Sequence, residues 1–263
     1  MTRTVQRREA RRAEPGRRGS AAASLGTIAI GTSGWSYRHW RERFYPRDLP
    51  TSRWFSFYAQ RFDTVEINAT FYRLPTEAAV RRWREAAPPG FTFSVKGSRL
   101  ITHARRLQSA ERALATFFER ISLLGDRLGC VLWQLPPAFV PELDVLDRFL
   151  ASVPGDVRHA VELRRVGEPA PELLRILEEH GASYVCTSSS AAPADRRVTS
   201  DLVYVRFHGL SGGFAHSYTA EELRPWARFL RKARGEGRSA LVYFNNDGEG
   251  RAPEDAAKLS ALL

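Results

Sequence analysis

The sequence lacks the features that would mark several classes of protein. It has two cysteines among 263 residues, Cys130 and Cys186, far apart within apolar stretches. Such spacing is neither a disulfide framework nor a metal motif, so we expect buried free thiols in a reducing compartment. No apolar run approaches the roughly 20 residues needed to cross a membrane, and no apolar segment of a secretory signal follows the first arginines. We therefore expect a cytoplasmic protein without a membrane partner.

Lysine is nearly absent, so arginine supplies the positive charge. The formal net charge of +11 suggests nucleic acid as a possible partner. However, residues 1–24 carry seven arginines and two glutamates, which places +5 in this segment and +6 in the remainder. High charge with few apolar residues predicts a disordered basic tail over residues 1–24 and one folded domain over residues 25–263. The tail could be a basic arm that contacts phosphates, but we favour a solvated, non-essential extension.

Eight short apolar runs alternate with helical patterns along the whole chain. They are rich in β-branched and aromatic residues, as strands buried on both faces are. The runs cover residues 27–32, 64–68, 91–96, 130–134, 159–163, 183–187, 202–208 and 240–245. This alternation requires parallel pairing through right-handed crossovers, and eight units predict a closed (β/α)8 TIM barrel. The alternative, a doubly wound open sheet, normally has a glycine-rich phosphate loop, and no such nucleotide-cofactor motif occurs here.

Several residues mark the expected starts of helices. Thr76 and Ser109 stand where an N-terminal cap is needed, and Ser109 would open a helix over residues 109–124. Thr219 with Glu222 three positions later has the pattern of a capping box.

Polar side chains gather where the predicted strands end, which in a TIM barrel is the mouth that holds the active site. Three pairs stand two positions apart and so share a face of their strand: Glu66 with Asn68, Glu162 with Arg164, and Arg206 with His208. Pointing outward would bury charges beneath the helices, so we expect these pairs to face the lumen. The other candidates for substrate binding are Trp35, Tyr37, Tyr72, Lys96, His103, Gln134, Asn245 and Asp247.

Six ordered motifs resemble those of the YecE-like family, a domain of unknown function with a TIM-barrel fold. They are G-T-S-G-W-S-Y at 31–37, V-E-I-N-A-T-F-Y at 65–72, Lys96 followed by Thr102-His103, Q-L-P-P at 134–137, V-R-F-H-G at 205–209 and Y-F-N-N-D at 243–247. The resemblance runs from about residue 28 to the C-terminus and implies the fold but no established activity. Arg165 stands where the family usually has histidine, no tryptophan follows it, and Thr187-Ser188-Ser189 occupies a stretch where aspartate is common.

Three kinds of chemistry are compatible with these residues. Lys96, Arg164 and Arg206 could clamp a phosphate or carboxylate with help from His103 and His208, or the arginines could neutralise the glutamates in a structural network. A divalent metal is possible but not favoured, because its candidate ligands have no diagnostic spacing and lie near these cations. Those candidates are Glu66, Glu162, His103, His208 and Asp247. No other cofactor is indicated.

Acid–base catalysis is the third possibility. Glu66 and Glu162 could act as acid and base, with His208 as an alternative. Trp35 and Tyr37 could stack on a sugar or base, whereas Trp40 and Phe44 fit better as a small core within their loop. The preferred hypothesis is therefore an enzyme for a small anionic, phosphorylated or sugar-like substrate, of lyase, isomerase or hydrolase type. The alternative is a non-catalytic barrel that binds a ligand or nucleic acid.

Overall fold

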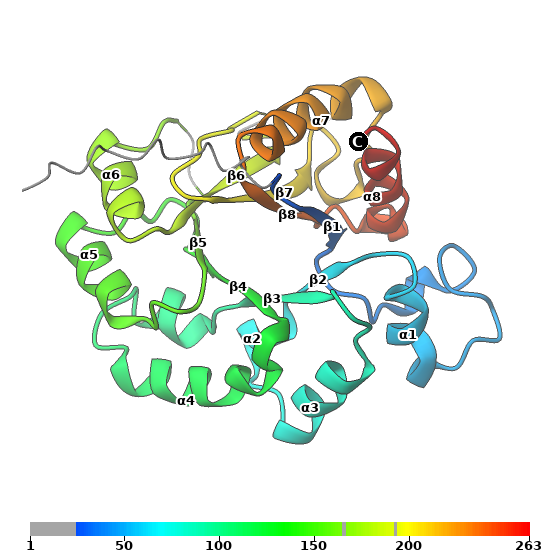
Figure 1. Cartoon of the computed structure of the whole chain (residues 1–263), viewed down its shortest axis with the longest axis horizontal. Coiled ribbons are helices and arrows are strands. Elements are labelled where there is room, and N and C mark those ends of the chain that lie inside the picture. The colour runs from blue at the N-terminus through cyan, green and yellow to red at the C-terminus, as the bar shows by residue number, and fades with distance from the viewer. Residues whose placement is uncertain (1–24, 165–166, 192–193) are drawn as a thin grey trace, which may run out of the picture.

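A computed structural model describes residues 25–164, 167–191 and 194–263 of the chain. The predicted tail over residues 1–24 and the family departure at Arg165 lie outside these described residues. Eight parallel strands form one sheet in the order β1-β8-β7-β6-β5-β4-β3-β2 (Figure 1). Their bounds are β1 Ile28–Thr32, β2 Thr64–Ile67, β3 Thr92–Lys96, β4 Leu128–Gln134, β5 His159–Glu162, β6 Ser183–Ser189, β7 Leu202–Gly209 and β8 Ser239–Phe244. The TIM-barrel prediction is confirmed, with strand ends within a few residues of those expected.

Strands β1 and β2 close the ring without a continuous ladder. One parallel bridge joins Ser33 to Glu66. Below it, the Tyr58 hydroxyl accepts a hydrogen bond from the Thr32 amide at 2.9 Å and donates one to the Thr64 carbonyl at 2.9 Å. Gly31 permits this close approach, because a Cβ there would lie 2.0 Å from the Thr64 carbonyl oxygen. A tyrosine side chain thus replaces part of the main-chain pairing at this seam.

Helices surround the strands as expected for βα units (Figure 1). Their bounds are α1 Trp54–Tyr58, α2 Ala69–Tyr72, α3 Glu77–Ala86, α4 Glu111–Ile121, α5 Leu143–Ser152, α6 Pro171–Glu179, α7 Ala220–Gly235 and α8 Ala252–Ala261. The expected alternation along the whole chain fails at one place. Between β6 and β7 the described residues form no helix, since this short polar connection has no apolar face to bury. Within the described parts of the chain, no helix combines the length and apolar character needed to cross a membrane.

The predicted helix caps are confirmed in two of three cases. The Thr76 side chain accepts a hydrogen bond from the Ala79 amide, and Thr219 and Glu222 form a complete capping box at α7. Ser109 does not cap α4, because it lies one residue before the N-cap with a φ of +47°. Ala110 holds the cap position without a side-chain hydrogen bond.

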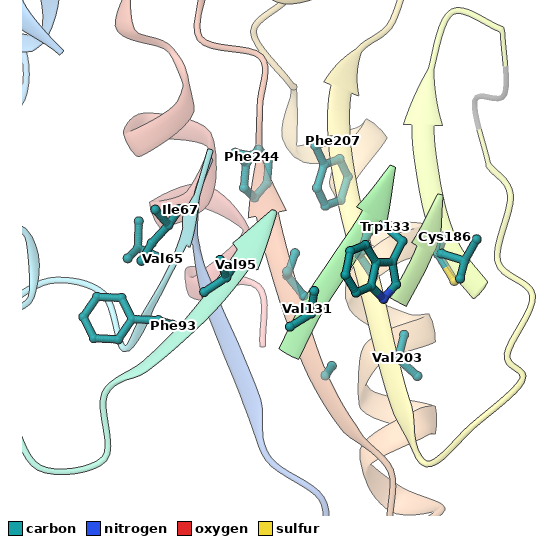
Figure 2. Close-up of a cluster of buried hydrophobic side chains, with 14 of the residues drawn as sticks. Val65, Ile67, Phe93, Val95, Val131, Trp133, Cys186, Val203, Phe207 and Phe244 are labelled. Carbon is teal, nitrogen blue, oxygen red and sulfur yellow. The ribbon is translucent and has the colours of Figure 1, made fainter. Parts of the chain in front are cut away.

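Alternating side chains divide the buried apolar residues into two cores. Val65, Phe93, Val131, Trp133 and Phe207 are among those in the large core that the helices cover (Figure 2). A smaller cluster within the barrel consists of Cys130, Leu132, Ala160, Val185, Leu202, Tyr204, Leu241 and Tyr243. Both cysteines are buried and free, as predicted, one in each core. The apolar lumen core forms the floor beneath the polar mouth.

Candidate functional site

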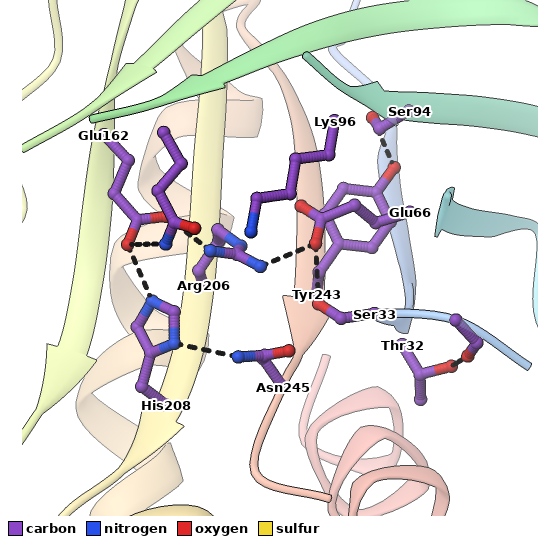
Figure 3. A network of polar contacts seen from close by, with 12 residues as sticks. Thr32, Ser33, Glu66, Ser94, Lys96, Glu162, Arg206, His208, Tyr243 and Asn245 are labelled. Atoms are coloured by element: carbon purple, nitrogen blue, oxygen red, sulfur yellow. Dashed lines mark hydrogen bonds and ion pairs between the residues drawn. The ribbon is translucent and has the colours of Figure 1, made fainter. Parts of the chain in front are cut away.

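The polar layer above the lumen core follows from strand alternation. In β7, the buried Tyr204 belongs to the lumen core, so Arg206 and His208 point into the barrel above it. The intervening Phe207 faces the helices. The same period brings Glu66 from β2, Glu162 from β5 and other strand-end residues into one layer (Figure 3). The prediction that Glu66, Glu162, Arg206 and His208 face the lumen is confirmed.

Arg206 lies between the two glutamates and pairs with both. Its Nη2 atom donates to Glu66 Oε1 at 2.7 Å, and its Nη1 atom donates to Glu162 Oε2 at 2.5 Å (Figure 3). All three side chains are at most 1% exposed. The two carboxylates therefore share the positive charge of Arg206. This is the structural network that the sequence left open as the alternative to an anion clamp, because Arg206 pairs with the glutamates. Glu66 also accepts hydrogen bonds from Ser33 Oγ at 2.7 Å and the Tyr204 hydroxyl at 2.6 Å.

Glu162 and His208 form a buried carboxylate–imidazole pair. Glu162 Oε1 lies 3.0 Å from His208 Nε2 and accepts a hydrogen bond from Gln134 Nε2 at 2.9 Å. The amide nitrogen of Asn245 lies 3.1 Å from His208 Nδ1. Because an amide nitrogen only donates, Nδ1 is the acceptor and the ring proton lies on Nε2, toward Glu162.

The charges of this pair follow from burial and from Arg206. Burial lowers the pKa of His208, against the raising effect of Glu162, so the imidazole is neutral at pH 7. Burial alone would raise the pKa of Glu162, but Arg206 and His208 outweigh it and hold that pKa well below 4.5. The pair is therefore an ionised carboxylate beside a neutral imidazole.

Lys96 comes from β3 and ends close to this network (Figure 3). Its Nζ atom lies 4.2 Å from the centre of the Phe71 ring. In the part of the chain that the structure describes, Nζ has neither a hydrogen-bond acceptor nor an ion-pair partner. Burial and the charge of Arg206 lower the pKa of Lys96 from 10.5 to about 8, against the opposing effects of Glu66 and Glu162.

Two cavities open at the strand ends on opposite sides of the ring. The larger, about 740 Å³, has walls that include Trp35, Tyr37 and Asn68. The Oδ1 atom of Asn68 is buried there with no partner among the described residues. The smaller, about 320 Å³, is lined by Glu162, Arg164 and His208. Thr187 and Ser189 of β6 add hydroxyl groups to its wall. The mouth therefore has an aromatic side and a charged side.

Asp247 belongs to a separate cluster at the rim of the mouth. Its carboxylate lies 2.8 Å from His39 Nε2 and accepts a hydrogen bond from Trp40 Nε1 at 2.6 Å. Burial raises the pKa of Asp247. Trp40 is fully buried against Phe44 and Tyr45, so the expected small core of this loop is confirmed. Asp247 thus fastens the first βα loop to the last one.

Besides Asp247, Trp35 and Tyr37, four more predicted residues lie at the edge of the central network or outside it. Asn68 follows the end of β2 with a helical backbone, so it leaves the face of Glu66 and lines the larger cavity. Tyr72 is 74% exposed. His103 packs against Phe71 and bonds to Thr102, and burial together with Lys96 lowers its pKa. Arg164 is 40% exposed, and its Nε lies 3.9 Å from Glu162.

The sequence analysis missed Ser33, Tyr204 and His39. Tyr204 could have been found, because it precedes Arg206 and His208 at the same two-residue period. Ser33 could not have been found in this way, because its bond to Glu66 depends on the closure of β1 against β2. His39 lies in a single 3-10 turn, Arg38–Trp40, which is too short for a periodic pattern to indicate which way a side chain points.

Nothing in the described ranges brings three or more His, Cys, Asp or Glu side chains together in a group that could hold a metal ion. The oxygen atoms of Glu66 and Glu162 already bind Arg206 and neutral donors. This donor set suits a charged hydrogen-bond network better than it suits a divalent cation.

Comparison with known families matches residues 29–263 to the one described as "Protein of unknown function DUF72". The chain belongs to the DUF72 family. It is 37% identical to the UPF0759 protein YecE of Escherichia coli K12 over 145 residues, which make up 53% of this chain and 53% of YecE. The chain thus spans about half the length of YecE in that match. With the UPF0759 protein YunF of Bacillus subtilis it shares 25% identity over 269 residues, covering 90% of this chain and 94% of YunF.

Solved DUF72 structures have the same fold. A family member from Thermotoga maritima MSB8 superposes with a TM-score of 0.81 at 26% identity, covering 90% of this chain and 98% of that protein. Another from Enterococcus faecalis V583 gives a TM-score of 0.79 at 22% identity, with 90% and 95% covered. The resemblance to the YecE-like family and the barrel fold are thereby confirmed, and the activity of this DUF72 barrel has to be inferred from its site.

Proposed function

We propose that this DUF72 barrel is an enzyme that carries out acid–base chemistry on a small anionic substrate at its mouth. The observation that carries this proposal is the buried Glu66–Arg206–Glu162 network. Removing charges from water costs several kcal/mol per ion, and well-packed apolar residues in their place are often at least as stable. A fold gains little from such a cluster at the centre of its mouth, whereas catalysis uses groups whose ionisation the protein controls.

The Glu162–His208 pair is the proposed proton-transfer unit. Glu162 keeps the ring proton on Nε2, which leaves Nδ1 as the basic atom. Nδ1 faces the Asn245 amide, so a substrate hydroxyl that displaces this amide would present its proton to His208. Glu66 would act from the other side of Arg206, where a substrate hydroxyl can take the place of Ser33 on its carboxylate.

The same mouth offers groups for an anionic, phosphorylated or sugar-like molecule. Arg164 lines the smaller cavity and is the more exposed cation, so we assign it to the anionic group. Across the ring, Trp35 and Tyr37 provide aromatic surface for a sugar face. The unpartnered Oδ1 atom of Asn68 supplies an acceptor for a hydroxyl or amino group.

The test is a screen of phosphorylated sugars, sugar acids and oxo acids for turnover by the wild-type protein and by Glu66→Gln. We expect the substitution to abolish turnover while circular dichroism shows an intact fold. Glu77→Gln is the matched control, because Glu77 makes the same chemical change on α3 with a side chain that is 57% exposed. Full turnover by Glu66→Gln would refute its role, and tight binding without turnover by the wild type would favour a non-catalytic binding barrel.

A further inference from the structure

Lys96 differs from the other two lysines of the chain in its chemical setting. Of 40 lysines and arginines only Lys96, Lys232 and Lys258 are lysines, so this sequence uses arginine for nearly all positive charge. Lys232 and Lys258 lie in helices with side chains 78% and 41% exposed. Lys96 alone of the three stands at a strand end in the barrel mouth. A guanidinium binds anions well but cannot lose its proton in a protein, whereas an amine can become a nucleophile.

The surroundings of Lys96 make the neutral amine more common than in an ordinary lysine. Arg206 takes both buried carboxylates, which leaves Lys96 without an ion-pair partner in the described structure. The groups that face it are the cations Arg206 and Arg164, the anions Glu66 and Glu162, the imidazole of His103 and the ring of Phe71. With a pKa of about 8, about one amine in ten is neutral at pH 7. In that fraction of molecules Nζ has a lone pair free to attack, at the strand end where Lys96 stands.

We propose that Lys96 is a nucleophilic amine that forms an imine with a small carbonyl compound bearing an anionic group. This inference rests on the proposed function and names its substrate class, an oxo acid or an oxo phosphate. Arg164 lines the charged side of the mouth and interacts electrostatically with Lys96, so we assign it to the anionic group of a compound whose carbonyl carbon reaches Nζ.

The reaction needs no group from outside the mouth. The Nζ lone pair forms a bond to the carbonyl carbon, and the carbonyl electron pair moves to oxygen. Both protons of the neutral amine then leave with that oxygen as water, which gives the imine. His208 and Glu66 belong to the network beside Lys96, and we assign them to proton exchange at the carbon adjacent to the imine carbon, whose protons the imine makes more acidic.

Reductive trapping tests the proposal with simple probes. The protein is incubated at pH 7 with glyoxylate, or with the uncharged aldehyde glycolaldehyde, and with cyanoborohydride. The modified lysine is then located by peptide mass spectrometry. We expect glyoxylate to label Lys96 at least tenfold faster than Lys232 or Lys258, which are internal controls in the same sample. Lys96→Arg keeps the positive charge and should lose the label. Lys96→Met also removes the amine and should lose the label, so it provides a second variant if Lys96→Arg does not fold.

A second variant separates the amine from the anion site. Arg164→Gln should reduce labelling by glyoxylate to the rate for glycolaldehyde while Lys96 still reacts with both. Labelling should also rise with pH through about 8, as Nζ loses its proton. Equal labelling of all three lysines by glyoxylate would overturn the inference. So would total labelling of the protein that stays at the wild-type rate in both Lys96 variants, because the label would then lie on other residues.

Failure of this inference is distinguishable from failure of the proposed function. If the metabolite screen finds a substrate and Lys96→Arg turns it over at the wild-type rate, the imine is wrong and the acid–base proposal stands. If glyoxylate labels Lys96 selectively but Glu66→Gln does not affect turnover, the nucleophilic lysine stands and the role of Glu66 is wrong.

Discussion

Replacing Arg206 with methionine leaves two carboxylates buried without their cation. Glu66 and Glu162 are 0% and 1% exposed, so solvent cannot take over the role of the guanidinium. Removing one partner of a buried ion pair costs about 3–5 kcal/mol, and Arg206 serves two carboxylates. We expect Arg206→Met to lower the free energy of unfolding at pH 7 by at least about 4 kcal/mol, measured by urea denaturation.

The pH dependence of this loss has a definite sign. In the wild type the pKa of Glu162 lies well below 4.5, so its contribution to stability is present above that value and lost as the pH falls through the lowered pKa. Without Arg206, burial would raise the pKa of Glu162 instead. The variant should then gain stability as the pH falls through that raised pKa, and the gap to the wild type should narrow in acid.

A second substitution shows whether the effect is electrostatic. Glu66→Gln in the wild type removes charge-assisted hydrogen bonds and should cost about 1–2 kcal/mol. In the Arg206→Met background the same change removes an uncompensated charge, so it should increase stability. If Glu66→Gln destabilises both proteins equally, or Arg206→Met is as stable as the wild type at pH 7, the charge-balance reasoning is wrong.

Three further predictions concern the scaffold and the tail. Thr219→Ala removes the side-chain acceptor of the α7 capping box and should cost about 1 kcal/mol, seen as a lower midpoint of thermal unfolding. Gly97→Ala should lower the free energy of unfolding in urea by about 1–3 kcal/mol, because its Cβ would lie 2.4 Å from the Trp133 ring. Gly155→Ala is the control, since its Cβ would meet no atom within 4 Å and the loss should be much smaller. Deletion of residues 1–24 should remove any salt-sensitive DNA binding measured by fluorescence anisotropy; unchanged binding would place that surface on the barrel instead.

The barrel was predictable from sequence because strands buried on both faces leave a strong local signal. Runs such as residues 202–208 are apolar and end in polar groups that recur at every second residue. This pattern predicted both the strand and the inward direction of Arg206 and His208. The partners of these groups could not be read in the same way. Whether Arg206 binds a ligand or the two glutamates depends on distances across the barrel, which no local pattern records.

Local irregularities caused the remaining differences. The strand period predicts that Asn68 shares a face with Glu66, but the backbone turns helical at Asn68 and redirects the side chain. Ser109 has the residue type of a cap and the wrong backbone conformation for one. Both outcomes are decided by a single pair of backbone torsions, to which residue preferences are only a weak guide.

The seam between β1 and β2 links ligand binding to the shape of the barrel. Its bridge pairs Ser33 with Glu66, and the Tyr58 hydroxyl bonds both strands where a ladder would otherwise run. A ligand that displaces the Ser33 hydroxyl from Glu66 therefore acts on the joint that completes the cylinder. At this joint the closure of the cylinder depends on one bridge and two hydroxyl groups, where other neighbouring strands have a ladder of main-chain bonds. We therefore expect the seam between β1 and β2, beside the 740 Å³ cavity, to be the part of the barrel most sensitive to what the mouth holds.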